Sequence, residues 1–188
     1  MNVIKTPLEG AFIVEPQVFG DNRGWFMETY NEKKLRDAGI AVPAFVQDNQ
    51  SYSAQKGIVR GLHCQLPPYA QAKLIRCTRG AIEDVIVDVR KGSPSYGKHF
   101  KVLLTAENKR QLYIPKGFLH GFVTRTDDVE VQYKVDAYYE KSADRSVRFD
   151  DPAFGIAWDV SDPVLSEKDK NAPLYADSDV SFVYGREI

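Results

Sequence analysis

Short runs of β-branched and aromatic residues, separated by turn residues at intervals of about ten, constrain the fold of this chain more than any other feature. The turn signals include Arg79-Gly80, Pro115-Lys116-Gly117 and Asp127-Asp128. The runs have the length of strands rather than of helices. They are Gly10–Pro16, Leu74–Cys77, Ile82–Val89, Lys101–Thr105, Gln111–Ile114, Gly121–Thr124 and Val129–Val135. This rhythm predicts an all-β, antiparallel sandwich or barrel rather than strands that alternate with helices.

Two short segments have the end signals of helices. Asn31 has a side chain suited to N-cap a helix over Glu32–Ala38. Gly39 follows at the position where a left-handed residue commonly ends a helix. Ser166–Lys170 is predicted to form a short helical turn before Pro173. The sequence therefore predicts a β protein with one or two short helices.

Size and charge narrow the classes of protein to which the chain can belong. A chain of 188 residues can bury about 70% of the surface that it exposes when unfolded, so we expect one domain, residues 1–188. We expect the N-terminal third, before Gly57, to pack on the barrel or on a partner subunit. Lys and Arg number 25 and Asp and Glu number 26, a formal net charge of -1. This balance argues against a general binder of nucleic acid or of anionic membranes.

The expected location follows from targeting and cysteine patterns. The first seven residues carry no long apolar segment of the signal-peptide kind, and no apolar run approaches the ~20 residues of a membrane span. Cys64 and Cys77 have neither CxxC nor metal-type spacing. We therefore expect a cytoplasmic protein whose two thiols are reduced.

Two of the histidines lie in settings that an ordinary strand histidine lacks. His63 follows Arg60 by three residues and precedes Lys73, so cationic side chains gather around one potential base. His120 ends the pattern Pro115-x-Gly117-x-x-His120. A lone histidine in a strand is more often a core or surface residue than a catalyst, so the setting rather than the residue type makes these two candidates.

These two segments resemble the two halves of the cupin barrel signature, the first half over Gly57–His63 and the second over Pro115–His120. The resemblance implies a cupin-like antiparallel jelly-roll β-barrel. Metal-binding cupins continue the first half as His-x-His with a Glu soon after, whereas this chain has His63-Cys64-Gln65 and no Glu before Glu83. Because a catalytic metal usually takes three protein ligands, we expect no metal site.

Over nearly its whole length the chain resembles the dTDP-4-dehydrorhamnose 3,5-epimerase family, the sugar-nucleotide epimerases of the L-rhamnose pathway. The resemblance rests on many segments in the same order and on no single motif. The segments are Asp21–Glu28, Phe45–Ser51, Gly57–Gln65, Gln71–Lys73, Asp84–Pro94, Ile114–Phe122, Tyr133–Tyr139 and Leu165–Asp169.

The resemblance implies a reaction at the two carbons beside a ketone. The family converts dTDP-4-dehydro-6-deoxy-D-glucose to dTDP-4-dehydro-L-rhamnose by removing and returning a proton at C3 and C5 through an enolate. This chemistry needs a base, an acid on the opposite face and a donor near the C4 oxygen, but no redox cofactor. The implied protein is a metal-independent homodimer that binds a dTDP-sugar and uses no cofactor.

The resemblance assigns a catalytic role to four residues. It makes His63 the base, oriented by Asp169 on its other ring nitrogen, and Tyr133 the acid. Lys73 would stabilise the enolate oxygen by its charge. A neutral imidazole suits the first role, because histidine changes charge near neutral pH.

Each of these residues also has a purely structural interpretation. Ser166-x-x-Asp169 has the form of a capping box, and Asp169 can serve both purposes only if its side chain is shared. Taken alone, Lys73 would be a surface lysine and Tyr133 a core tyrosine with a satisfied hydroxyl.

A larger set of residues is implied to bind the substrate. Arginine suits a diphosphate because its planar fork binds two oxygens at once. In the family the site is built with help from a second subunit, so the strand that carries Arg23 and Glu28 is a candidate contribution from a partner. The set is Arg23, Glu28, Gln47, Asn49, Arg60, Lys73, His120, Tyr139, Asp144 and Lys168.

Strand geometry sets one condition on this site. Arg60 and His63 are an odd number of residues apart, so a regular strand would direct them to opposite faces. Gly61, between them, can host a β-bulge that brings both to one face.

Three other functions are compatible with parts of the pattern. A mono-epimerase that inverts only C3 or only C5 in another dTDP-deoxysugar pathway would share the same base and phosphate groups. A non-enzymatic cupin that senses a sugar nucleotide would need the anion-binding set but neither Tyr133 nor Asp169. A metal-dependent cupin enzyme would need a stoichiometric metal ion.

Overall fold

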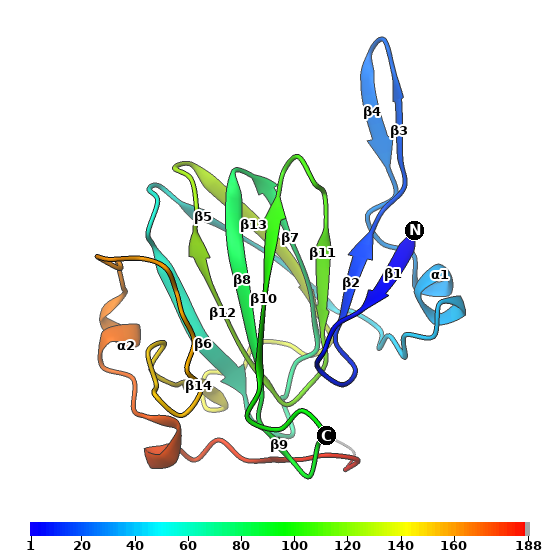
Figure 1. Cartoon of the computed structure of the whole chain (residues 1–188). Coiled ribbons are helices and arrows are strands. Elements are labelled where there is room, and N and C mark those ends of the chain that lie inside the picture. The colour runs from blue at the N-terminus through cyan, green and yellow to red at the C-terminus, as the bar shows by residue number, and fades with distance from the viewer. Residues whose placement is uncertain (187–188) are drawn as a thin grey trace.

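The computed structural model describes residues 1–186 and shows two antiparallel sheets that face each other as an open barrel (Figure 1). The six-stranded sheet has the order β1 (Asn2–Lys5), β2 (Phe12–Glu15), β11 (Gln111–Ile114), β7 (Lys73–Arg79), β13 (Val129–Val135) and β5 (Gln47–Ser53). The five-stranded sheet has the order β10 (His99–Thr105), β8 (Ala81–Asp88), β12 (Phe118–Thr124), β6 (Val59–Gln65) and β14 (Asp144–Ser146). The antiparallel, mostly β architecture predicted from the sequence is confirmed.

Smaller elements complete the fold. Two strand pairs lie outside the main sheets, and both helices are short. These elements are β3 (Val18–Asp21) with β4 (Gly24–Met27), β9 (Arg90–Lys91) with β15 (Phe182–Val183), α1 (Glu32–Asp37), α2 (Glu167–Lys170) and a 3-10 turn at Tyr175–Asp177. Among the residues that the structure describes, no helix is long and apolar enough to cross a membrane.

The central strand β8 explains how the core is built. Its alternate residues point to opposite faces. Ile82 and Ile86 belong to the cluster between the two sheets, while Val85 and Val87 pack under the chain that covers the outer face of the five-stranded sheet. All four side chains are fully buried, and each contributes about 1.5–3 kcal/mol through the loss of apolar surface to water. The near-continuous apolar sequence of β8 therefore reflects burial on both faces.

Both predicted helices form with the predicted caps. The Asn31 side chain accepts a hydrogen bond from the backbone N–H of Lys34 at 3.0 Å, and Gly39 takes a φ of +86° directly after α1. The Ser166 side chain likewise accepts from the backbone N–H of Asp169 and begins α2. α1 buries Leu35 in a third cluster on the outer face of the six-stranded sheet.

The hairpin of β3 and β4 projects away from the barrel (Figure 1). Its apolar side chains lack a cover in the single chain, since Trp25 is 59% and Phe26 69% exposed. One cationic contact reaches it from the barrel, with Lys109 Nζ 4.4 Å from the Trp25 ring centre. Exposed aromatic side chains on a two-stranded ribbon are unusual for a monomer, because such a ribbon is marginal by itself.

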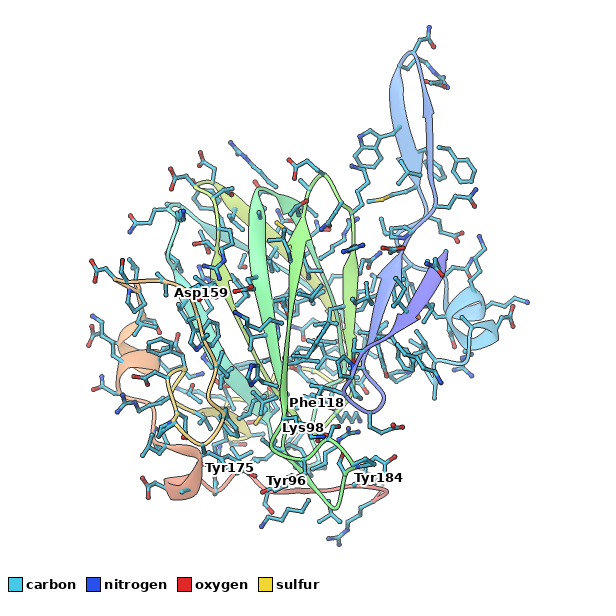
Figure 2. The ribbon with its side chains drawn as sticks, in the orientation of Figure 1. Tyr96, Lys98, Phe118, Asp159, Tyr175 and Tyr184 are labelled. Atoms are coloured by element: carbon cyan, nitrogen blue, oxygen red, sulfur yellow. The ribbon has the colours of Figure 1, made fainter. Side chains whose placement is uncertain are left out.

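A buried ion pair holds one end of the barrel together. Asp88 accepts hydrogen bonds from the Arg90 guanidinium and from the hydroxyls of Ser93 and Ser95. The Arg90 guanidinium also lies 4.5 Å from the Phe118 ring centre and 5.1 Å from that of Tyr184, which joins the C-terminal segment to this end. Figure 2 labels Phe118 and Tyr184 at this end of the barrel. Removal of either ionic partner would leave a buried charge uncompensated.

Candidate active site

A cavity of about 390 Å³ lies against the inner faces of both sheets and beneath α2. Strands β6 and β12 supply its histidines, β7 and β13 its lysine and tyrosine, and α2 its carboxylate. Six of the predicted site residues line it, namely Arg60, His63, Lys73, His120, Tyr133 and Asp169.

His63 and Asp169 are in direct contact. The Nε2 atom of His63 lies 2.5 Å from Oδ1 of Asp169, whose side chain is only 4% exposed. Burial alone would raise the pKa of Asp169, but hydrogen bonds from His63, the Ser166 hydroxyl and the Gly61 backbone N–H outweigh it and lower that pKa. Asp169 is therefore an ionised acceptor that fixes the proton of His63 on Nε2 and leaves the lone pair on Nδ1.

The Asp169 side chain is shared between the histidine and the helix cap. Its Oδ2 atom accepts a hydrogen bond from the Ser166 hydroxyl at 2.9 Å, while Oδ1 meets His63. One Asp169 side chain thus contacts both the residue that caps α2 and His63, which is the shared geometry that the two interpretations require.

A β-bulge in β6 brings Arg60 and His63 to the same cavity, as the position of Gly61 predicts. His120 pairs with His63 and Phe122 with Arg60, so two residues of β6, Gly61 and Leu62, lie opposite one residue of β12, Gly121. Gly61 has a φ of +123°, a conformation that side-chain-bearing residues rarely adopt. The extra residue in β6 therefore brings Arg60 and His63 to the same face, although they are an odd number of residues apart.

Lys73 and Tyr133 lie together on the neighbouring strands β7 and β13. The Lys73 ammonium is 5.8 Å from the Tyr133 ring centre and donates a hydrogen bond to the Gln71 side-chain oxygen at 3.3 Å. Burial lowers the pKa of Lys73, against the opposing effect of the surrounding negative groups, which include Asp144 and Asp84. Burial raises the pKa of Tyr133, with Arg60 opposing, so its hydroxyl stays protonated at neutral pH.

A second histidine–aspartate pair was missed by the sequence analysis. His120 Nε2 lies 2.9 Å from Oδ2 and 3.1 Å from Oδ1 of Asp84, which is fully buried on β8. Burial raises the pKa of Asp84, and His120 and Lys73 oppose that effect. A carboxylate within the apolar run Ile82–Val89 was the available signal, because a buried charge requires a partner.

Arg60 is held in place by β5. Its Nε–H donates to the Ser53 hydroxyl at 3.1 Å, and its terminal nitrogen donates to the Tyr52 carbonyl at 2.9 Å. Ser53 itself is buried. These bonds hold one edge of the guanidinium before any anion binds.

Five further predicted residues form a connected polar group outside the cavity lining. The Gln47 amide donates to the Asn49 oxygen at 2.8 Å and accepts from the Tyr139 backbone N–H at 3.3 Å. The Tyr139 hydroxyl donates to Asp144 at 3.2 Å, and Lys168 forms an ion pair with the same carboxylate at 2.5 Å. The Tyr139 ring is mostly exposed, so it offers a face to a ligand.

Arg23 and Glu28 are not brought to this cavity within one chain. Arg23 lies at the tip of the β3–β4 hairpin, where it forms an ion pair with Asp21 at 2.5 Å and is 85% exposed. Glu28 follows the hairpin and binds Lys34 at 2.8 Å and Asn31 at 3.1 Å.

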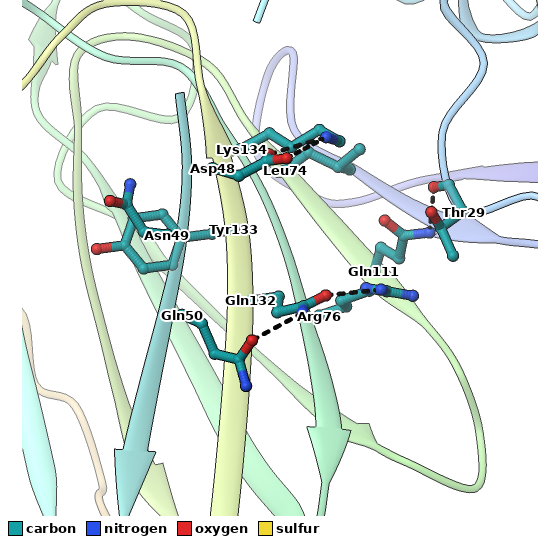
Figure 3. Close-up of a pocket in the computed structure, with 10 residues that line it drawn as sticks. All are labelled: Thr29, Asp48, Asn49, Gln50, Leu74, Arg76, Gln111, Gln132, Tyr133 and Lys134. Carbon is teal, nitrogen blue, oxygen red and sulfur yellow. Dashed lines mark hydrogen bonds and ion pairs between the residues drawn. The ribbon is translucent and has the colours of Figure 1, made fainter. Parts of the chain in front are cut away.

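A second cavity of about 380 Å³ lies along the six-stranded sheet (Figure 3). Gln132 accepts a hydrogen bond from Arg76 at 2.6 Å and donates one to Gln50 at 2.9 Å, and the ion pair of Lys134 with Asp48 at 2.8 Å adds a second cation to the wall of this groove. Figure 3 shows Asn49 and Tyr133 on the other side of their strands from these side chains, as alternation requires. This groove therefore faces away from the cavity that holds His63.

Among residues 1–186, no group of three or more His, Cys, Asp or Glu side chains is arranged to hold a metal ion. Cys64 and Cys77 are both buried and unpaired, and burial raises the pKa of Cys64 to about 12. Ser51 and Ser166 also line the cavity; the sequence analysis considered Ser166 only as a helix cap and did not single out Ser51. Ser51 shares the inner face of β5 with Asn49, so strand alternation was the available signal.

Comparisons with known proteins agree over most of the chain. The family model described as dTDP-4-dehydrorhamnose 3,5-epimerase matches residues 5–177. The chain is 50% identical to the dTDP-4-dehydrorhamnose 3,5-epimerase of Shigella flexneri over 95% of this chain and 98% of that protein. The crystal structure of the Bacillus anthracis dTDP-4-dehydrorhamnose 3,5-epimerase with TDP and PPi bound is 49% identical, covers 92% of this chain and 98% of its own, and has a TM-score of 0.89. The Legionella pneumophila dTDP-6-deoxy-D-glucose-3,5-epimerase in complex with dTDP-4-keto-L-rhamnose is 40% identical, covers 98% and 99%, and has a TM-score of 0.91.

Proposed function

Since the chain belongs to the dTDP-4-dehydrorhamnose 3,5-epimerase family, the isomerases of dTDP-rhamnose biosynthesis, we propose that the cavity around His63 is where it inverts C3 and C5 of dTDP-4-dehydro-6-deoxy-D-glucose. The observation that carries this proposal is the contact between His63 and the buried Asp169, with Tyr133 and Lys73 in the same cavity. A base, an acid and a cation around one cavity are what the reaction requires.

His63 acts as the base through Nδ1. Asp169 holds the proton on Nε2, so the Nδ1 lone pair removes the proton from the carbon beside the ketone. The imidazolium that results is stabilised by the ionised Asp169, whose pKa is lowered by its three hydrogen-bond donors although burial opposes them. The electrons of the broken C–H bond move to the C4 oxygen and form an enolate.

Lys73 and Tyr133 complete the proton transfer. The half-buried Lys73 ammonium stabilises the negative C4 oxygen by its charge. The Tyr133 hydroxyl returns a proton to the opposite face of the carbon, which inverts it. His63 then loses its proton and Tyr133 regains one by exchange with solvent, and the cycle repeats at the second carbon.

The remaining predicted residues bind the substrate. Arg60 is presented by Ser53 for bidentate contact with the diphosphate, and Lys168 adds a second cation. His120, whose Nε2 faces Asp84, presents its other ring nitrogen to the sugar. Gln47, Asn49 and Tyr139 provide amides and a ring face for the thymine base, and Asp144 holds the Lys168 ammonium beside them.

We assign a homodimer to the functional protein. The exposed hairpin aromatics need a cover, and Arg23 and Glu28 lie outside their own cavity. In the dimer, a second copy covers the hairpin, which then delivers Arg23 and Glu28 to the nucleotide in that copy's site. Burial of the hairpin aromatics at the interface removes their cost of exposure to water. A cytoplasmic location stays a prediction, in keeping with the free thiols of Cys64 and Cys77.

NMR of dTDP-4-dehydro-6-deoxy-D-glucose in deuterated water, with a reductase to trap the product, tests the proposed function. Deuterium at both C3 and C5 with the L-rhamnose configuration is expected. His63→Ala is expected to abolish this exchange while binding of dTDP, measured by calorimetry, survives. Inversion at one carbon only would make the chain a mono-epimerase, and near-normal exchange in His63→Ala would reject His63 as the base.

A further inference from the structure

The Ser166 hydroxyl makes two hydrogen bonds to one residue. It accepts from the backbone N–H of Asp169 at 3.1 Å, which begins α2, and it donates to the Asp169 Oδ2 atom at 2.9 Å. The other carboxylate oxygen, Oδ1, lies 2.5 Å from His63 Nε2. Each oxygen of Asp169 therefore has its own partner, and the Gly61 backbone N–H adds a further bond to the carboxylate.

We propose that Ser166 is a positioning residue for the reaction: its hydroxyl fixes the Asp169 carboxylate so that His63 keeps its proton on Nε2 and presents Nδ1 to the substrate. The proposal rests on the assignment of His63 as the base. Ser166 touches no reacting atom and acts through Asp169.

The direction of each hydrogen bond follows from the proton count. An ionised carboxylate only accepts, so the protons on both of its oxygens must come from Ser166 and His63. The Ser166 hydroxyl has one proton and gives it to Oδ2, while its lone pair receives the backbone N–H. With Oδ2 occupied, the carboxylate cannot rotate freely, and Nε2–H is the tautomer of His63 that satisfies Oδ1.

The cap alone does not require serine at this position. Glycine and aspartate also begin helices, and glycine costs only a few tenths of a kcal/mol relative to serine as an N-cap. Glycine has no hydroxyl, and aspartate has no proton to give and would place a second negative charge beside Asp169. Only a hydroxyl that caps and donates at once supports both the short helix α2 and the orientation of the carboxylate.

Loss of the hydroxyl would act on the base and leave the Arg60 contact with the diphosphate intact. Without Ser166 as donor, the Asp169 carboxylate is free to turn, and His63 then samples the tautomer whose Nδ1 carries the proton and cannot act as a base. Arg60 is held by β5 and is independent of α2, so contact with the diphosphate remains. We expect kcat to fall about 10- to 100-fold, the size of effect seen when a catalytic group is misplaced, with KM changed less than about twofold.

Four variants of the full-length protein test the proposal. Ser166→Gly and Ser166→Ala remove the hydroxyl, the glycine variant with little loss of capping, and Ser166→Thr restores a hydroxyl. Thr105→Ala is the matched control, since the Thr105 hydroxyl accepts backbone N–H bonds from Glu107 and Asn108 outside the cavity lining. The readouts are kcat and KM, together with the ¹⁵N NMR shifts of the His63 ring nitrogens, which report the tautomer without substrate and are assigned by their loss in His63→Ala.

The expected result is a reduced kcat in the glycine and alanine variants, ring-nitrogen shifts that move toward each other, and recovery of both in Ser166→Thr. Wild-type kcat in Ser166→Gly would overturn the proposal. A reduced kcat with unchanged ring-nitrogen shifts would also overturn it, because the loss would then act through the helix. Activity in His63→Ala would instead reject the proposed function, and the two failures are thus distinct.

Discussion

Replacement of Gly61 by alanine is predicted to destabilise the protein more than the same change at Gly39 or Gly121. A Cβ at this position would lie 2.5 Å from the Gly121 Cα and 2.7 Å from the His120 carbonyl oxygen. These are backbone atoms of β12, so no side chain can move aside. Gly61 also has a φ of +123°, which alanine adopts only at a cost.

Two other glycines separate the contributions. Gly39 has a φ of +86° with nothing within 4 Å of the added Cβ, so Gly39→Ala measures the conformational cost, about 1–2 kcal/mol. Gly121 has no such φ but its Cβ would lie 2.8 Å from the Arg60 carbonyl oxygen, so Gly121→Ala measures the steric cost, about 1–3 kcal/mol. Gly61→Ala carries both, about 2–5 kcal/mol, which is a large part of a typical stability of about 5–15 kcal/mol.

Urea unfolding followed by tryptophan fluorescence, with m-values compared among the three variants, gives the three free energies. Gly61→Ala is also expected to lose kcat at temperatures where it remains folded, because the bulge that aligns Arg60 with His63 must shift. The reasoning would be refuted if Gly61→Ala cost no more than Gly39→Ala, since the two strands would then not be as close as the structure has them.

Three further outcomes are expected. In Tyr133→Phe, His63 should still remove the proton and return one to the same face, so deuterium enters with retained configuration and the rate of inversion falls about 100-fold. Inversion at the normal rate would contradict the assignment of Tyr133 as the acid. Because burial lowers the pKa of Lys73, kcat should fall as pH rises through a value below the ordinary 10.5, and Lys73→Arg should move this loss to higher pH; an unmoved pH profile would implicate another group. Arg60→Ala should weaken dTDP binding in calorimetry by about 10- to 100-fold, and Ser53→Ala by less, whereas equal affinity in all three proteins would remove Arg60 from the diphosphate site.

Local patterns explain what the sequence alone could predict. Strand β13 has the predicted limits of Val129–Val135, because alternation and flanking turn residues are local properties. The cap of α1 at Asn31 and the bulge at Gly61 were predicted for the same reason, since each depends on a few neighbouring residues. The resemblance to a family supplied the roles of Lys73 and Tyr133, which their local sequence would have left as a surface and a core residue.

Features that depend on register were not predictable in this way. The pair of His120 and Asp84 requires knowledge that β12 lies beside β8, and the two residues are far apart in the sequence. The exposure of the β3–β4 hairpin was not predictable from neighbouring residues either. Tryptophan is usually largely buried, and only the three-dimensional structure shows that Trp25 is uncovered. Prediction was thus limited by pairing between strands rather than by the identity of the residues.

The projecting hairpin also has a genetic consequence. In the proposed homodimer, each active site combines the cavity of one polypeptide with the β3–β4 hairpin of the other. Two copies of the gene that are inactive for different reasons can therefore complement each other. A cell with two inactive alleles, His63→Ala in one and Arg23→Ala in the other, would still make some active enzyme. Random pairing makes about half of the dimers mixed. Of the two sites in a mixed dimer, one has both an intact cavity and an intact hairpin, so about a quarter of all sites would function. Neither allele would show any activity when expressed alone.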